Sequence, residues 1–165
     1  MLETLRIQNY ALIDEIEIDF REGFNVLTGE TGAGKSIVVG ALTLVLGARA
    51  ERDAVRDGAD RAKVDAVFRV RKPSRRLAAI LKKADVELED GELMLSRTVT
   101  LDGRSRAYVC GNLVPVSVLA EIGDELVDLH GQHEHQSLLK PERQLELLDG
   151  VARTEADAAA VAERV

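Results

Sequence analysis

The sequence has few of the residues that build disulfide-linked, metal-bound or membrane-embedded proteins. Its single cysteine, Cys110, excludes an internal disulfide and leaves no cysteine pair for a zinc site. No stretch approaches the ~18 apolar residues of a membrane-spanning helix. The N-terminal acids do not follow the basic-then-apolar order of a signal peptide. We therefore expect a cytoplasmic protein with no membrane contact.

Aromatic residues are also scarce, at 3% of the chain with no tryptophan, so Leu, Val, Ile and Ala must form the core. Hydrophobic residues make up 45% and charged residues 31%, which is typical of a globular domain. The net charge of −7 argues against a protein whose whole surface binds nucleic acid, although a local basic patch stays compatible with it. These values predict one domain with a core of its own.

One segment, residues 69–83, carries only basic charges. It is either a solvated helix face or a contact for DNA or a partner protein. Its basic residues are Arg69, Arg71, Lys72, Arg75, Arg76, Lys82 and Lys83.

A glycine-rich octapeptide supplies the clearest functional signal. It fits the pattern G-x-x-x-x-G-K-S of the phosphate-binding P-loop, whose backbone N–H groups surround phosphate oxygens. Lys35 is expected to reach the β- and γ-phosphates, and the Ser36 hydroxyl is expected to bind Mg²⁺. The pattern therefore predicts ATP and Mg²⁺ as cofactors. The eight residues are Gly29, Glu30, Thr31, Gly32, Ala33, Gly34, Lys35 and Ser36.

The flanks of this octapeptide have the order that a P-loop needs. The apolar run 24–28 predicts a buried strand before it, and residues 37–46 predict a helix after it, ended by Gly47. The N-terminus of that helix would direct its positive dipole end at the bound phosphate.

Elsewhere the polarity pattern predicts several further elements. Helices are expected at 77–83, at 117–122 and from Pro141 onward, where the spacing of apolar residues up to Val165 is that of a coiled coil. Turns are expected at Gly58, at Asp102-Gly103 and at Gly111-Asn112. The predicted strands are residues 2–10, 16–20, 63–70, 92–100, 105–109 and 125–129.

A complete ATPase site also needs an acid at the end of a second buried strand and a group that positions the attacking water. Asp128, at the end of the predicted strand 125–129, is a weak candidate for that acid. The second half of the site is therefore expected beyond residue 165 or on another chain. Three histidines in one stretch could in principle bind zinc, but they lack a cysteine and the H-E-x-x-H spacing. They are His130, His133 and His135.

Over residues 1–150, these features together resemble the N-terminal half of the head domain of the RecN family. That family comprises bacterial DNA-repair ATPases of the SMC-like branch of the ABC superfamily. The resemblance is carried by Leu5–Phe20, by Phe24–Ser36, by Gly103–Val109 and by the run Leu126–Gln136. The last of these contains His-Gly-Gln-His-Glu-His-Gln and is the most family-specific. Cys110 departs from the family pattern, which usually has asparagine there.

The resemblance implies an α/β fold with a mixed sheet around the P-loop helix, and a division into residues 1–150, half a head, and 151–165, the start of a coiled-coil arm. It implies that Gln132, or else Gln136, acts in a Q-loop that reaches Mg²⁺ and the attacking water. Arg49 or Arg52 could form an arginine loop that faces nucleotide or DNA.

For partners, the resemblance implies the C-terminal half of the same head, a second head that shares two ATP molecules, and DNA, preferentially double-stranded ends. The expected activity is ATP hydrolysis in repair of double-strand breaks, with a nucleoid-associated location. Two other readings of the P-loop stay open, a self-contained kinase or nucleotide switch and a non-catalytic interaction module.

Overall fold

The computed structural model describes residues 1–29, 34–51 and 53–129, together with 148, 151, 152, 154 and 161. The chain divides into two units, Met1–Leu126 and Val127–Val165. All the strands and helices named below belong to the first unit.

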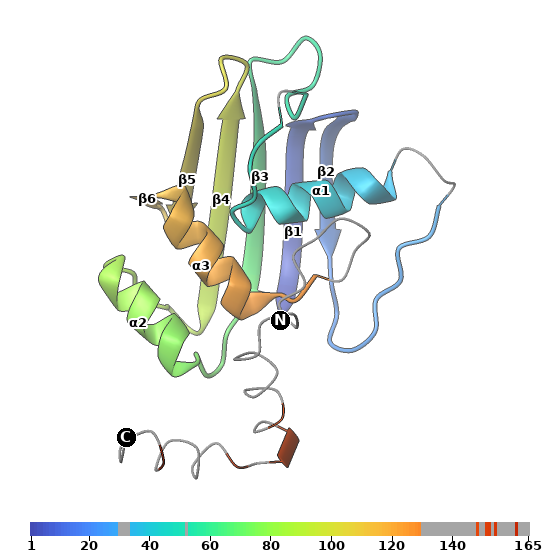
Figure 1. Ribbon diagram of the computed structural model, residues 1–165. Coiled ribbons are helices and arrows are strands. Elements are labelled where there is room, and N and C mark those ends of the chain that lie inside the picture. Colours follow the sequence, from blue (N-terminus) through green and yellow to red (C-terminus); the bar gives the residue numbers. More distant parts are fainter. Residues whose placement is uncertain are drawn as a thin grey trace. The chain divides into compact units, whose positions relative to one another are not determined.

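Six strands form one sheet in the order β2-β1-β3-β4-β5-β6, and each pairing is antiparallel (Figure 1). β1 and β3 lie next to each other although the P-loop region separates them in the sequence. The long loops between them therefore leave the sheet and return to it. The strands are β1 (Leu2–Tyr10), β2 (Ile13–Asp19), β3 (Arg61–Arg69), β4 (Glu92–Thr100), β5 (Ser105–Val109) and β6 (Asn112–Val114).

Three helices lie on one face of this sheet: α1 (Lys35–Val45), α2 (Arg75–Lys83) and α3 (Val116–Leu126) (Figure 1). Alternating apolar residues point from the strands toward them, as the period of two in a strand requires. The largest fully buried side chains on these elements belong to Leu5, Ile7, Val45, Val64, Phe68, Leu93, Leu95, Val99, Val109, Leu119 and Ile122.

The end of α1 packs unusually close to α3. Gly47 has φ +101, and a Cβ at this position would lie 2.5 Å from the Cα of Ala120. A Cβ on Gly123 would likewise lie 2.5 Å from the carbonyl oxygen of Leu46. Glycine at these two positions therefore lets the backbones approach, and this contact fixes where α1 ends relative to α3.

Most of the predicted elements are confirmed. The strand predicted at 92–100 has the bounds of β4 and that at 105–109 the bounds of β5. The helix after the P-loop ends as expected before Gly47. The helix predicted at 77–83 begins two residues earlier, because the Ser74 hydroxyl accepts a hydrogen bond from Leu77 N–H at 3.0 Å and caps it. The α/β class and the position of the P-loop helix on the sheet are also confirmed.

Two predicted strands are wrong, and one short strand was missed. Residues 24–28 form no strand in the described structure. Residues 125 and 126 end α3, in which the buried Leu119, Ile122 and Gly123 and the half-buried Leu126 follow helical spacing. Residues 112–114, expected only as the end of a turn, form β6. The helix predicted from Pro141 lies outside the described residues, apart from isolated positions.

Candidate functional site

The N-terminus of α1 meets the requirements of an anion site. Gly34 is the N-cap and has no side chain that could bond the first amides of the helix. The first regular bond of this helix runs from Val38 N–H to the Gly34 carbonyl at 3.1 Å. No acidic residue lies in the first turn to neutralise the dipole. The positive end of α1 is therefore available to an anion.

Lys35, the first residue of α1, turns its side chain back toward Gly29. Its Nζ donates a hydrogen bond to the carbonyl oxygen of Gly29, the first residue of the P-loop pattern. A Cβ built on Gly29 or on Gly34 would meet nothing within 4 Å, so space is open beside the backbone at both ends of the loop. Lys35 and the exposed Ser36 therefore both stand at the N-terminus of α1, and their roles toward phosphate and Mg²⁺ stay predictions.

The segment that leads into the loop is apolar and exposed. The exposed fraction is 94% for Phe24, 63% for Val26 and 43% for Leu27. Its start is held by Asn25, whose side chain donates to the Arg21 carbonyl at 2.8 Å and accepts from Arg21 N–H at 3.1 Å. No strand pairs with this segment in the part of the chain that the structure describes. Its apolar side chains are therefore uncovered there.

The helix α1 also has uncovered apolar side chains, on the side that faces away from the sheet. Its sequence after Lys35 contains no charged residue, and Val39 is 44% exposed. A helix that is apolar all round is normally buried on all sides. Toward the sheet, α1 is well covered: Ala41, Leu44 and Val45 are buried. The outer side thus lacks a packing partner among the described residues.

Tyr10 at the end of β1 is a contact that sequence reasoning missed. A Cβ on Gly40 would lie 3.2 Å from the Tyr10 hydroxyl, so this ring packs directly under α1. Burial raises the pKa of the Tyr10 hydroxyl, with smaller contributions from the charges of Glu51 and Asp53. The alternation in β1 predicts the strand but carries no signal for this contact.

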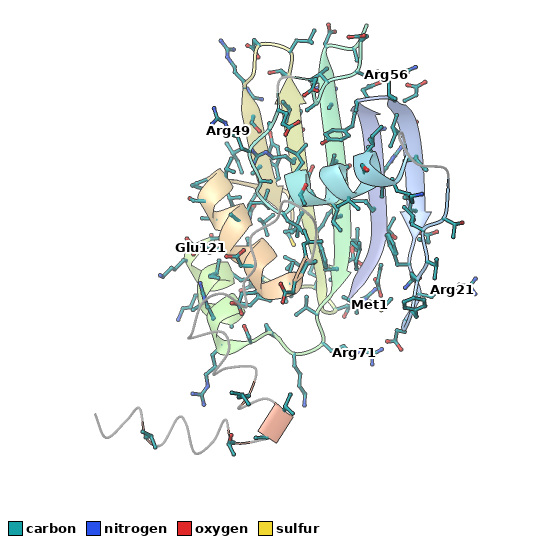
Figure 2. The ribbon with its side chains drawn as sticks, turned by 45° about the vertical axis from the view of Figure 1, so that its right-hand side comes forward. Met1, Arg21, Arg49, Arg56, Arg71 and Glu121 are labelled. Carbon is teal, nitrogen blue, oxygen red and sulfur yellow. The ribbon has the colours of Figure 1, made fainter. Side chains whose placement is uncertain are left out.

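Several predicted site residues lie outside the described residues: Glu30, Thr31, Gly32, Ala33, Arg52, His130, Gln132, His133, His135 and Gln136. Arg49 is described and lies exposed on the loop after α1 (Figure 2). Asp128 is exposed and does not follow a strand, so the geometry that made it a candidate acid is absent.

Among the described residues, no group of three or more His, Cys, Asp or Glu side chains could hold a metal ion. Within the same residues, no helix has the length and apolarity to cross a membrane.

Comparison with known proteins supports one family. Residues 4–150 match the model of the AAA domain family. The chain is 43% identical over 152 residues to "DNA repair protein RecN" of Halalkalibacterium halodurans, covering 92% of this chain and 27% of that protein. It is 45% identical over 153 residues to the protein of the same name from Vibrio cholerae, again covering 92% and 27%. The chain therefore spans about a quarter of the length of these relatives.

Solved structures support the fold. A chain reported under "Structural biochemistry of ATP-driven dimerization and DNA stimulated activation of SMC ATPases" aligns with a TM-score of 0.62 at 21% identity, covering 91% of this chain and 98% of that one. The SMC head domain from Thermotoga maritima aligns with a TM-score of 0.52 at 20% identity, covering 70% and 39%. At these identities the likeness is one of fold.

Proposed function

Because this chain belongs to the AAA domain family, we propose that it is the ATP-binding half of an SMC-like ATPase head that acts in recombinational repair of DNA double-strand breaks. The observation that carries the proposal is the N-terminus of α1, which has no side-chain cap and whose Lys35 ammonium reaches back to the Gly29 carbonyl. The names of the relatives give the biological setting.

The described residues fit a nucleotide at this place. The α1 amides and the Lys35 ammonium would hold the phosphates, and the Ser36 hydroxyl would contribute one oxygen to Mg²⁺. Held there, Mg²⁺ would supply positive charge against the negative charge that develops on the phosphates. On binding, the Lys35 ammonium would exchange its bond to the Gly29 carbonyl for one to a phosphate oxygen. Gln132 would complete the site from the family-specific run.

The uncovered apolar residues support a split site. Phe24, Val26 and Leu27 would become a buried strand, and Val39 on α1 would be covered, once the C-terminal half of the same head packs against them. That half would also supply the acid that this chain lacks. Two completed heads would then enclose two ATP molecules, and hydrolysis would open them. Such a head would work on DNA in the cytoplasm, associated with the nucleoid.

ATP turnover tests the proposal. The chain alone is expected to hydrolyse ATP very slowly, and addition of the C-terminal half should raise the rate by several orders of magnitude, as for other phosphoryl-transfer sites completed in trans, where gains are ~10³–10⁵-fold. Lys35→Ala should abolish this gain, whereas the matched exposed variant Lys83→Ala should retain it.

Rapid turnover by the chain alone would instead favour a self-contained kinase or switch. Assembly with the C-terminal half but no turnover would favour an interaction module.

A further inference from the structure

One face of the sheet carries mostly polar side chains, and at one end of it cations outnumber acids. At this end, β4 turns into β5 and a shallow hollow opens to solvent. The hollow is lined by Asp60, Arg61, Thr98, Thr100, Leu101, Asp102, Arg104 and Arg106. Lys63 lines the neighbouring part of the same face beside Arg61 and Thr98.

The strand register arranges four cations in a grid. Lys63 on β3 pairs with Thr98 on β4, which pairs with Arg106 on β5. Two residues away on β3, Arg61 pairs with Thr100 on β4. The Thr100 N–H donates a hydrogen bond to the Arg104 carbonyl at 2.9 Å.

Each row of this grid therefore reads cation, threonine, cation. Neighbouring strands lie ~4.8 Å apart and alternate residues ~6.8 Å apart, so the grid measures about 10 by 7 Å at the backbone. We name these four cations, Arg61, Lys63, Arg104 and Arg106, the basic grid.

Two members of the basic grid already have acidic neighbours. Lys63 pairs with Asp65 at 2.8 Å, and Arg104 pairs with Asp102 at 3.1 Å. The side chains of Arg61 and Arg106, at diagonal corners, are exposed and have no ion pair or hydrogen bond among the described residues. Like charges this close repel one another. An anion that spans the grid would relieve that repulsion.

The rival basic segment, 69–83, is more fully neutralised than the sequence suggests. Arg69 donates to both carboxylate oxygens of Glu3 at 3.0 Å. Arg71 pairs with Glu22 at 3.1 Å, and Arg76 lies 3.5 Å from a carboxylate oxygen of Glu125. The contacts of these three arginines hold elements of the fold together. The other cations of this segment, Lys72, Arg75, Lys82 and Lys83, are exposed and belong to a loop and to α2. The basic grid differs from them because strand register places its four cations in two rows on one face of the sheet.

We propose that the basic grid binds the phosphate backbone of duplex DNA, an inference that rests on the proposed function. Duplex DNA presents a continuous row of phosphates along each strand, so two rows of cations on one face can contact separate phosphates of one strand. The Thr98 hydroxyl lies between the cations and can donate to a phosphate oxygen. The residues that line the hollow include no aromatic side chain, and Tyr108 lines only the neighbouring part of the face, whereas single-strand binders stack bases on several aromatic side chains.

DNA affinity of the full-length protein, followed across a salt series, tests this proposal. The double variant Arg61→Ala/Arg106→Ala removes the two unpaired corners and should bind a labelled 40-base-pair duplex more weakly. The slope of log affinity against log salt should fall in magnitude by about 1.8, since each phosphate contact contributes ~0.9. The control Arg75→Ala/Lys83→Ala removes the same charge from exposed positions of α2 and should leave the slope unchanged.

A charge-retaining variant, Arg61→Lys/Arg106→Lys, should keep most of the slope and guards against an effect of misfolding. The inference is overturned if the Arg61→Ala/Arg106→Ala variant binds DNA with the wild-type salt slope; an acidic protein would then be the expected partner of this surface. It is also overturned if the salt slope falls in the α2 control variant instead. ATP hydrolysis without DNA, measured on the same samples, tests the proposed function separately from the basic grid. If the wild-type protein shows no ATP turnover that depends on Lys35, the proposed function is contradicted. If the wild-type protein hydrolyses ATP but does not bind DNA, only the role of the basic grid is contradicted.

Discussion

Two phenylalanines show how differently apolar side chains are buried in the paired sheet and in the segment before the glycine-rich loop. Phe68 on β3 is 1% exposed, between paired strands and beneath the helices, whereas Phe24, just before the glycine-rich loop, is 94% exposed. Both belong to apolar runs that predict strands from their sequence. The strands of the sheet pair with one another, whereas residues 24–28 pair with no strand among the residues that the structure describes. An apolar run thus predicts that a residue will be buried, but not which chain segment will cover it.

The largest effect is expected from the paired region. Phe68→Ala should lower the free energy of unfolding by ~3–5 kcal/mol, because it removes a large buried side chain and leaves a cavity. Chemical denaturation of the chain measures this loss. A change below about 1 kcal/mol would mean that the sheet is not the stable part of the molecule.

A smaller loss should follow at the contact between α1 and α3. In Gly123→Ala the new methyl group would lie 2.5 Å from the Leu46 carbonyl oxygen, so a backbone must move. Such overpacking costs ~1–3 kcal/mol. Gly40→Ala is the matched control, since its methyl group meets only the mobile end of Tyr10 at 3.2 Å and gains helix propensity. Equal losses for the two variants in thermal denaturation would show that the α1–α3 contact is not what limits stability.

The paired region should also depend on pH. The hydrogen bond from Arg69 holds the pKa of Glu3 below its ordinary value of 4.5. Since the folded pKa is depressed, the stabilising effect is present above the unfolded value and is lost as the pH falls through the folded one. Glu3→Gln should therefore flatten the stability profile slightly below about pH 4.5, as followed by denaturation at several pH values. An unchanged acid limb would mean that this pair is fully screened.

The smallest effect in the isolated chain is expected from Phe24→Ala. Because Phe24 has almost no contact to lose, the free energy of unfolding should change by no more than ~0.5 kcal/mol. The comparison sharpens when the C-terminal half is added, because the same variant should then weaken assembly, as measured by titration calorimetry. A large loss in the isolated chain, close to that of Phe68→Ala, would contradict the uncovered position of Phe24.

Elements of the paired sheet were predictable from the sequence, whereas the segment before the glycine-rich loop was not. The bounds of β4 and β5 were predictable because their alternation is satisfied by neighbouring strands of this chain. The segment 24–28 was predicted as a strand from the same kind of pattern, yet a strand also needs a paired edge. At 125–129, a short apolar run fitted either a strand or the end of a helix, and the buried stripe of α3 decided it. The α1–α3 contact and the basic grid depend on register and close approach, which one sequence does not reveal.

The central claim is that this chain is one half of a nucleotide site whose apolar entry segment is covered by the other half. Amide hydrogen exchange at residues 24–28 tests it most directly, because exchange reports whether a backbone N–H is hydrogen-bonded and protected. We expect the amide hydrogens of residues 24–28 to exchange rapidly in the chain alone and to be strongly protected after the C-terminal half is added. Exchange in β4 should change little. Strong protection in the chain alone, or none in the assembled head, would contradict it.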